Sequence, residues 1–334
     1  MDNELQSIMD SILTYGEELL RIPGISGHED EVASYFTSKL SGYGSISRDP
    51  IGNCVLRIGN QQSNFKILVT AHMDSVGFIA KRINDDLEAD LLPVGINQLN
   101  TYRNCCLAAI GEKKTVKGTL QIENNSFPKF LVEKDEATLP EAAVDVGDQV
   151  VAFKPAEISK NAKILKGCWL DNRMGLSVLI NLAKSIPQEF PADICILASV
   201  REEIGAKGAG AVLREFHPDF AIVIDATWTQ ASVLKGHGPV LTVWDPCVVV
   251  KPKDRRLITK LAAKLSIPLQ KEAVGQGSSD AGPFTQAGIP TFCLMYPVEG
   301  LHTPSEEVAL KDAAWNLMLV RSLLDVLKSQ DKNG

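Results

Sequence analysis

Histidines and carboxylates follow or interrupt apolar segments at several places in this chain. Residues 66–74, 194–203, 221–226 and 292–302 are apolar runs that carry such residues at their C-terminal ends, and residues 167–175 place an aspartate where a helical pattern begins. No matching cluster of Lys or Arg accompanies them, so these groups would repel one another unless a cation lay between them. The pattern predicts a metal site built from His72, Asp74, Asp171, Glu202, Glu203, Asp225 and His302.

His72 and Asp74 are two residues apart at the end of a strand-like run, which places both side chains on one face. A carboxylate beside a metal-binding imidazole commonly accepts its second N–H and fixes its tautomer. The two residues could equally form a plain hydrogen-bonded pair, because His-x-Asp alone is a weak signal. Both interpretations are open from this motif by itself.

Glu202 and Glu203 directly follow the apolar run ICILASV, where a solvated helix face is not expected. Adjacent carboxylates can divide the work, since one can bind a metal ion while the other acts as a general base toward its water. The alternative is an ordinary surface pair. Asp225 interrupts an apolar run, and a carboxylate there is costly unless it is paired or coordinated.

Asp171 stands where we expect the N-cap of a helix that begins at Asn172. Capping alone would explain it, but one carboxylate could also bridge two ions. His302 follows a strand-like run and precedes Thr303 and Pro304, so we expect it on an irregular segment near the sheet edge. Structural roles are the simpler interpretation for the other histidines, His28, His217 and His237.

Other catalytic motifs are missing from the sequence. It contains no GxSxG serine motif, no GxxxxGK[ST] phosphate loop and no HExxH helix. The glycine cluster at 205–210 follows a strand-like run, but its spacing is not GxGxxG and two acids precede it. Acids at that position would repel a pyrophosphate.

The elements that must position these residues form an α/β fold. The β-branched runs read as buried strands of a mixed, largely parallel sheet flanked by helices, and ligands bind beyond the carboxyl ends of such strands. Between them, short strand patterns without a long helix predict a small inserted all-β domain over 76–165, so that residues 1–75 and 166–334 form one discontinuous catalytic domain. Helices are expected at 5–20, 28–40, 172–186, 208–216, 254–266 and 311–328.

Composition narrows the class of protein further. The 334 residues include 34 basic and 41 acidic side chains, a net charge of −7, which offers no basic surface for nucleic acid or an anionic membrane. We find no secretory signal and no apolar run of roughly 18 residues, and we expect a cytoplasmic protein. The seven cysteines are scattered without a CxxC pair, so neither a disulfide framework nor a thiolate zinc site is indicated.

Six motifs in fixed order resemble those of the glutamyl and deblocking aminopeptidases, a family of dinuclear metallopeptidases that includes the tetrahedral aminopeptidases and proteins once labelled endoglucanases. The motifs are AHMDSVGF, LDNRMG, REEIGAKGA, AIVIDAT, GQGSSDAG and GLHTP, and PGISGHEDEV also fits. The resemblance implies that His72 and Asp225 hold one metal ion, that Glu203 and His302 hold a second, and that Asp171 bridges them. Glu202 would be the general base and acid, and Asp74 would orient His72.

The resemblance also implies an inserted domain that mediates dimerisation and assembly of up to twelve subunits. In this chain the segment GINQLNTYRNCCLAAIG departs from the family pattern, and Arg201 stands where many relatives have Gln. The donor set suits zinc most, with cobalt or manganese also compatible. The native metal, the preferred N-terminal residue and the oligomeric state do not follow from the motifs.

Our leading hypothesis is a metal-dependent aminopeptidase that uses two divalent ions to hydrolyse the N-terminal residue of short peptides with a free N-terminus. Alternatives are another dinuclear amidohydrolase (a dipeptidase, carboxypeptidase or N-deacylase), a catalytically silent peptide-binding homologue, or a structural shell protein. The presence of Glu202 argues against a silent homologue, since a binding protein has no need for a base beside the metals.

Overall fold

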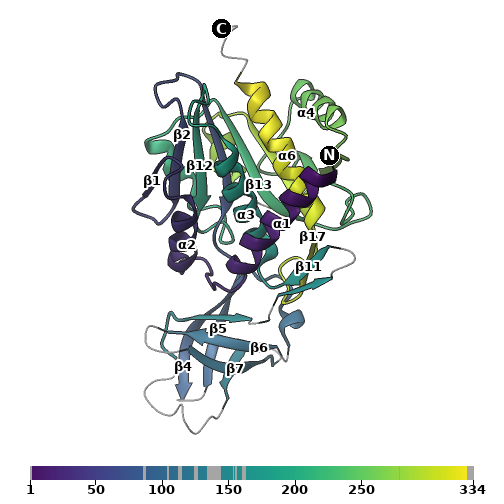
Figure 1. The fold of residues 1–334 in the computed structure, drawn as a ribbon. Helices are drawn as coiled ribbons and strands as arrows, with labels where there is room; N and C mark the ends of the chain where they lie inside the picture. Colours follow the sequence, from purple (N-terminus) through teal and green to yellow (C-terminus); the bar gives the residue numbers. More distant parts are fainter. Residues whose placement is uncertain are drawn as a thin grey trace.

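The molecule has two parts, a large α/β part and a small β-barrel beneath it (Figure 1). The computed structural model describes residues 2–85, 88–103, 105–111, 115–123, 127–133, 144–152, 154, 156–159, 163–277 and 279–328. Within them, no helix is both long and apolar enough to cross a membrane.

Four parallel strands form the centre of the large sheet, in the order β12, β3, β13, β16. Almost every residue of these strands is buried, as expected for parallel strands covered on both faces. Their β-branched and apolar side chains supply the core between the helices. The strands are β3 (Lys66–His72), β12 (Asp193–Ser199), β13 (Phe220–Trp228) and β16 (Thr291–Glu299).

Antiparallel strands extend the sheet beyond this parallel centre. One edge continues through β2 (Cys54–Gly59) to β1 (Ser45–Arg48). The other continues from β16 through β17 (Glu306–Ala309), β11 (Ile164–Gly167) and β10 (Glu157–Ser159), while β14 (Val240–Trp244) and β15 (Gln270–Ala273) form a branch on β16. The sheet is therefore mixed, and the parallel arrangement is confined to its central strands and the β14–β15 pair.

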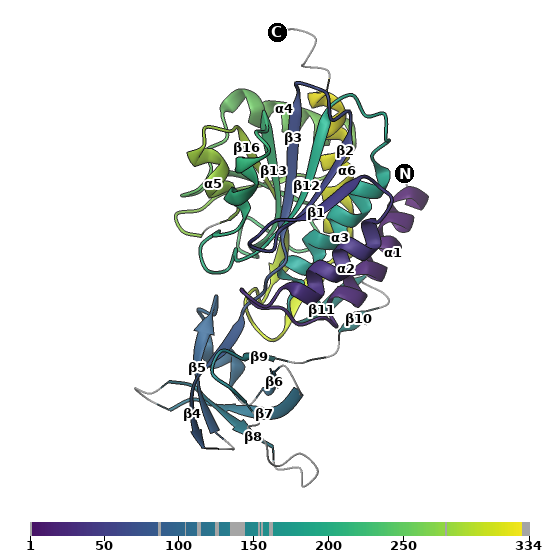
Figure 2. The same ribbon diagram turned by 90° about the vertical axis from the view of Figure 1, so that its left-hand side faces the viewer.

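Helices cover both sides of the sheet (Figure 2). Three of them pack together on one side, where the Ser177 hydroxyl of α3 donates to the Ile12 carbonyl of α1 at 2.7 Å, and Asn316 of α6 donates to the Leu294 carbonyl of β16 at 2.8 Å. The short α5 lies on the other side. The helices are α1 (Asp2–Leu19), α2 (Asp30–Leu40), α3 (Leu170–Ser185), α4 (Pro252–Lys264), α5 (Ala281–Gln286) and α6 (Leu310–Leu327).

Five of the six expected helices are present, and the sixth is different. The segment expected as a helix over 208–216 is a six-residue 3₁₀ helix, η2 (Ala209–Arg214). Two glycines, Gly208 and Gly210, weaken a helix at this point. Glycine at position 208 also lets the backbone pass close to Val200, because a Cβ there would lie 2.0 Å from the Val200 carbonyl oxygen.

The barrel is a closed sheet of six strands in the order β4-β5-β8-β7-β6-β9, in which β9 pairs back onto β4. Closure removes exposed strand edges, and side chains such as Phe78, Leu91 and Phe130 fill the interior. The strands are β4 (Gly77–Asp85), β5 (Glu88–Val94), β6 (Cys106–Ile110), β7 (Thr115–Gln121), β8 (Lys129–Val132) and β9 (Gln149–Ala152).

The barrel confirms the expected inserted all-β unit, with two differences in detail. Strands β5 and β6 show no clear alternation of apolar and polar residues, so their sequences alone do not predict them. The chain also re-enters the large sheet at β10, which pairs with β11 from Glu157 onward, earlier than the boundary expected after residue 165.

Candidate metal centre

The parallel strands bring the expected residues to one edge of the sheet. His72 is the last residue of β3 and pairs in register with Ser199, which ends β12 and precedes the Glu202–Glu203 pair. Asp225 lies in β13, and His302 follows β16. Because parallel strands point their carboxyl ends the same way, these side chains meet where the sheet faces the barrel (Figure 1).

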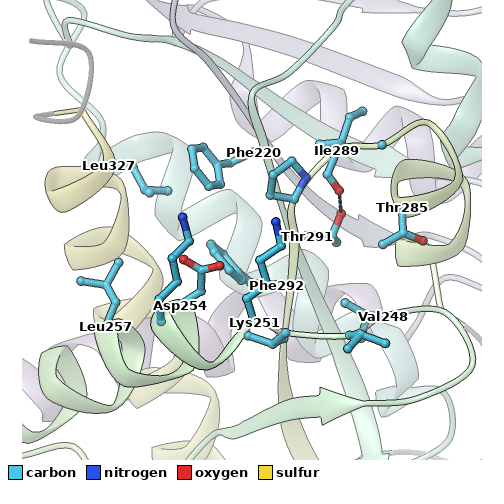
Figure 3. Close-up of a pocket in the computed structure, with 15 residues that line it drawn as sticks. Phe220, Val248, Lys251, Asp254, Leu257, Thr285, Ile289, Thr291, Phe292 and Leu327 are labelled. Atoms are coloured by element: carbon cyan, nitrogen blue, oxygen red, sulfur yellow. Dashed lines mark hydrogen bonds between the residues drawn. The ribbon is translucent and has the colours of Figure 1, made fainter. Parts of the chain in front are cut away.

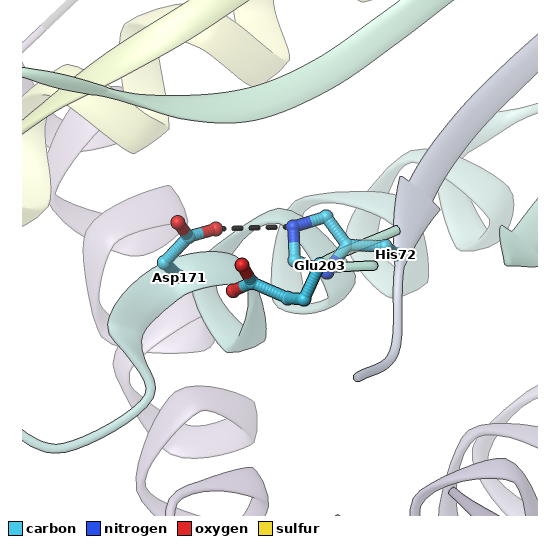
Figure 4. Close-up of side chains that lie close together, drawn as sticks. All are labelled: His72, Asp171 and Glu203. Carbon is cyan, nitrogen blue, oxygen red and sulfur yellow. Dashed lines mark hydrogen bonds and ion pairs between the residues drawn. The ribbon is translucent and has the colours of Figure 1, made fainter. Parts of the chain in front are cut away.

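Asp171 lies between the two histidines of this edge. Its Oδ1 atom is 3.1 Å from His72 Nε2, and its Oδ2 atom is 3.1 Å from His302 Nε2. Figure 4 shows the carboxylate of Asp171, at the start of α3, pointing toward His72 beside Glu203. One carboxylate therefore contacts both imidazoles through different oxygens, as a bridging ligand would.

Each histidine has a second carboxylate of its own. His72 Nε2 lies 3.2 Å from Asp225 Oδ1, and His302 Nε2 lies 3.4 Å from Glu203 Oε2. The centre thus consists of two half-sites, each with one imidazole and one carboxylate, that share Asp171. Donor atoms of His72, Asp171 and Glu203, which come from both half-sites, lie within 4.8 Å of one another, so the two half-sites are adjacent.

The side chain of Asp74 holds the Glu202–Glu203 segment. Its two oxygens accept the backbone N–H of Glu202 at 2.9 Å and of Glu203 at 3.1 Å, and Oδ2 also accepts the Ser26 hydroxyl at 2.6 Å. His72 Nδ1 lies 3.0 Å from the Asp74 backbone carbonyl and 3.5 Å from its Oδ1. The nearer partner of the imidazole is therefore the backbone of Asp74, while its side chain positions the two glutamates.

Asp171 does not cap α3, contrary to the expectation from the sequence. No side-chain capping hydrogen bond is present, both Asp171 and Asn172 have non-helical backbone angles, and the peptide bond between them is cis. The carboxylate faces the histidines instead. Asn172 turns toward Asp225 and donates to its Oδ1 at 2.9 Å, while its own side-chain oxygen accepts the Tyr296 hydroxyl at 2.8 Å.

Glu306 is a further residue of the centre that the sequence did not reveal. Its carboxylate accepts the backbone N–H of Asp171 at 3.2 Å and of His302 at 2.8 Å. It lies in β17 and is almost fully buried. Its sequence context, a pair of glutamates after GLHTPS, looks like an exposed surface, so only the fold identifies its role.

Electrostatics of the centre favour a bound cation. Burial, with the charges of Asp171 and Glu202, raises the pKa of Glu203 well above its usual value, and burial also raises the pKa of Asp225. For Asp171, burial is outweighed by hydrogen bonds with His302 and His72, which hold its pKa below the usual range. Without a cation, such carboxyl groups stay protonated or favour the protonated, positively charged form of the neighbouring imidazoles.

The donor set also fits a metal ion chemically. Nitrogen of two histidines and oxygen of three carboxylates, with no thiolate, is a set that suits zinc, cobalt or manganese. The Glu203 Oε1 atom is buried and has no hydrogen-bond partner among the described residues, which leaves a ligand oxygen available. The structure brings the sequence-predicted residues together at one edge of the sheet.

The barrel borders this centre through residues 95–102. The Tyr102 hydroxyl donates to the His302 carbonyl at 3.3 Å. Gly95 has a positive φ of 68°, and a Cβ there would lie 2.8 Å from Glu203 Oε2, so glycine is required for this close approach. The insertion therefore forms one wall beside the second half-site.

Not every cavity belongs to the centre. A cavity of about 480 Å³ is lined by Phe220 and Thr291, the first residues of β13 and β16, together with Lys251 and Asp254 (Figure 3). Because it lies at the amino ends of these strands, it opens at the edge of the sheet opposite the histidines. We assign no catalytic role to it.

Comparison with known proteins agrees with this geometry. The family model described as M42 glutamyl aminopeptidase matches residues 52–319, most of the chain. The chain belongs to the M42 glutamyl aminopeptidase family. The match covers all the residues of the two half-sites and the whole barrel, so family membership and the assembled centre rest on the same part of the chain.

Similar proteins match this chain over nearly its whole length. The lysyl aminopeptidase of Pyrococcus furiosus is 26% identical over 346 residues, which is 94% of this chain and 97% of that protein. An aminopeptidase from Desulfurococcus kamchatkensis shares the fold with a TM-score of 0.87 at 21% identity, covering 98% of each chain. The TET1 peptidase of Pyrococcus horikoshii, which can assemble into a tetrahedron or a large octahedral shell, has a TM-score of 0.81 at 23% identity, with 95% and 99% covered.

Proposed function

We propose that this protein is a metal-dependent aminopeptidase that removes the N-terminal residue of short peptides at a dinuclear centre. The observation that carries the proposal is the position of Asp171, whose two oxygens contact the imidazoles of two half-sites. Membership of an aminopeptidase family supports the reaction class. A single-ion site would not require a second histidine with a carboxylate of its own.

His72 and Asp225 would hold one divalent ion, Glu203 and His302 the other, and Asp171 would bridge them. Zinc is the ion we favour, and cobalt or manganese would suit the same donors. Bound there, two ions would supply Lewis acidity that lowers the pKa of water and polarises the scissile carbonyl. The protein holds the ligands in place through Asp74 and Glu306, which fix the backbone around four of the catalytic residues.

Glu202 is the proposed general base and acid. It is buried at the same edge, its backbone N–H is held by Asp74, and burial raises its pKa well above the usual value. In the reaction its carboxylate would take the proton of the attacking water and then deliver it to the leaving amine. The cation that we propose nearby would lower this pKa and make the carboxylate form available.

We further propose that the protein is cytoplasmic and assembles into a homo-oligomer, from a dimer up to twelve subunits, through the inserted domain of residues 76–165. Exposed apolar side chains on the barrel, Leu92, Phe127 and Val146, support a contact surface there. The assembly reported for the TET1 peptidase of similar fold is consistent with this proposal. Light scattering of the purified protein would test it, and a monomeric mass at micromolar concentration would contradict it.

The decisive experiment combines elemental analysis with a substrate panel. We expect about two divalent ions per chain and hydrolysis of aminoacyl p-nitroanilides that have a free amino group. N-acetylated and C-terminal substrates should not be cleaved. Activity only on blocked substrates would indicate an N-deacylase or carboxypeptidase, and a metal-loaded protein that is inactive on all peptides would indicate a binding or structural homologue.

A further inference from the structure

A cavity of about 600 Å³ is lined by residues that neighbour the metal centre. Its lining includes Ala226 and Trp228, which follow Asp225 in β13. It also includes Met295 of β16, which is paired with Asp225 in the sheet. The Trp228 ring lies 5.5 Å from the His302 ring, measured between centroids. The cavity is therefore next to ligands of both half-sites.

The mouth of this cavity faces the barrel. Trp228, Gln276 and Gly277 also line an adjoining hollow of about 510 Å³, whose other described residues are Asn97 and Gln98 of the insertion. A peptide could thus lie along the hollow while its first side chain enters the cavity. The indole of Trp228, which is 39% exposed, stands where the two spaces meet.

The cavity wall is partly apolar, and its polar residues include two carboxylates. Trp228, Met295 and Ala226 offer surfaces suited to a chain of methylene groups. Asp245 and Glu272, both about 5% exposed, also line the cavity. No Lys, Arg or His occurs among the described residues of this lining.

Neither carboxylate has a cationic partner within the described part of the chain. Glu272 accepts hydroxyl hydrogen bonds from Thr227 at 2.9 Å and Thr242 at 2.7 Å. Asp245 accepts the backbone N–H groups of Cys247 and Val248 at 2.6 and 2.7 Å. These neutral donors orient the two carboxylates without neutralising them, so a cation entering the cavity would gain their attraction.

We propose that this cavity receives the side chain of the N-terminal residue, and that Glu272 and Asp245 select peptides beginning with lysine or arginine. The inference rests on the proposed aminopeptidase function and names its substrate class. A basic side chain would lay its methylene groups against Trp228 and Met295 and bring its charge to the acids. An acidic first residue would be repelled.

The test compares lysine with norleucine, which has a similar apolar chain but no ammonium group. For the metal-loaded enzyme we expect kcat/KM for lysine p-nitroanilide to exceed that for norleucine p-nitroanilide by at least about 10-fold. Glu272→Gln keeps the size and can still bond to both threonines. It should lower the lysine value on the order of 10–100-fold and the norleucine value by less than about 3-fold.

Asp245→Asn is the second variant. Glu189→Gln is the matched control: Glu189 is an exposed acid on the loop before β12, and its substitution should change kcat/KM for neither substrate. Melting temperature checks that each variant is folded. Equal kcat/KM for the two substrates in the wild type, or equal losses for both in the Glu272 and Asp245 variants, would overturn the inference.

Calorimetric titration with lysinamide and norleucinamide supplies a readout that needs no turnover. Lysinamide should bind at least about 10-fold more tightly to the metal-loaded protein, and Glu272→Gln should remove most of that difference. If no substrate is hydrolysed, the aminopeptidase proposal fails while this binding preference still decides the role of the cavity. Equal affinities would refute the selection for basic residues even in an active enzyme.

Discussion

At the scale of single residues, two carboxylates outside the proposed set of metal ligands hold the backbone of the proposed site residues in place. Asp74 accepts the backbone N–H groups of Glu202 and Glu203, and Glu306 accepts those of Asp171 and His302. Each therefore connects two ligand-bearing or catalytic positions through the main chain. Such support explains how residues from separate loops could keep a fixed geometry.

The division of labour between the adjacent glutamates gives the first prediction. Glu202→Ala should leave metal content close to that of the wild type but reduce kcat on the order of 10²–10⁴-fold, because only the general base is removed. Glu203→Ala is the matched variant and should lose metal as well as activity. Mass spectrometry of metal content and steady-state kinetics would check both, and undiminished hydrolysis by Glu202→Ala would remove the base assignment.

A second prediction concerns Asp74. In Asp74→Asn, the amide group must face one of the two backbone N–H groups that the carboxylate now accepts, so one hydrogen bond is lost. We expect a destabilisation of about 1–3 kcal/mol and a kcat lowered by about 10-fold or more, with the substrate KM little changed. Ser26→Ala, which removes another partner of the same carboxylate, should have a smaller effect on kcat. Wild-type kcat in Asp74→Asn would contradict a positioning role.

The sequence predicts where a side chain lies in the fold when a strand pattern determines its position. His72 and the two glutamates stand at or after the ends of apolar runs and Asp225 interrupts one, so a parallel sheet brings them to one edge. Asn172 and Glu306 could not be foreseen in this way, because their contacts join segments far apart in the chain. The error at Asp171 has the same origin: a local helix signal favoured a cap, while the two distant histidines determine its orientation.

At the scale of elements, the amphipathic helices and the buried parallel strands were predicted most closely. Their periodic patterns are long enough to identify, whereas η2 and the strands β5 and β6 are short or irregular. The start of α6 shows what such patterns miss. Asp312 is fully buried there and accepts the backbone N–H groups of Gly236 and Gly238 at 2.6 and 2.8 Å, which fastens the loop before β14 to the helix.

This contact gives a prediction on pH. Burial raises the pKa of Asp312 to about 7, above its value of about 3.9 in an unfolded chain. The protonated form is thus favoured by folding, so its contribution to stability is fully present below about pH 4 and is lost as pH rises through 7. The advantage of the wild type over Asp312→Asn should therefore shrink from pH 5 to pH 8. Melting curves across this range would check it, and a constant difference would contradict the raised pKa.

At the scale of the whole molecule, the barrel approaches the candidate metal centre through the segment that follows β5. Residues 95–111 include Gly95, which approaches Glu203, and Tyr102, which bonds to the His302 backbone. The same segment contributes Asn97 and Gln98 to the hollow beside Trp228. We expect variation there to alter substrate access without changing the proposed ligands, so motifs that name those ligands do not determine specificity.

The centre also joins distant parts of the chain, which leads to the last prediction. Its proposed ligands come from β3, the start of α3, the loop after β12, β13 and the loop after β16. A metal ion that binds only the folded state raises the free energy of unfolding by about 4 kcal/mol when its free concentration is about 1,000 times its Kd. For a chain of this size we expect chelation to lower Tm by roughly 5–10 °C, since it also leaves the buried carboxylates without a cation.

Asp171→Asn supplies the comparison, because the loss of the bridging carboxylate should weaken metal binding and make Tm nearly insensitive to chelator. Glu189→Gln, far from the centre, should respond as the wild type does. Scanning calorimetry with and without chelator, with metal content measured on the same samples, separates the cases. If complete metal removal left the Tm of the wild type unchanged, the centre would not be what ties these segments together, and the buried acids would have to be neutralised by their own protons.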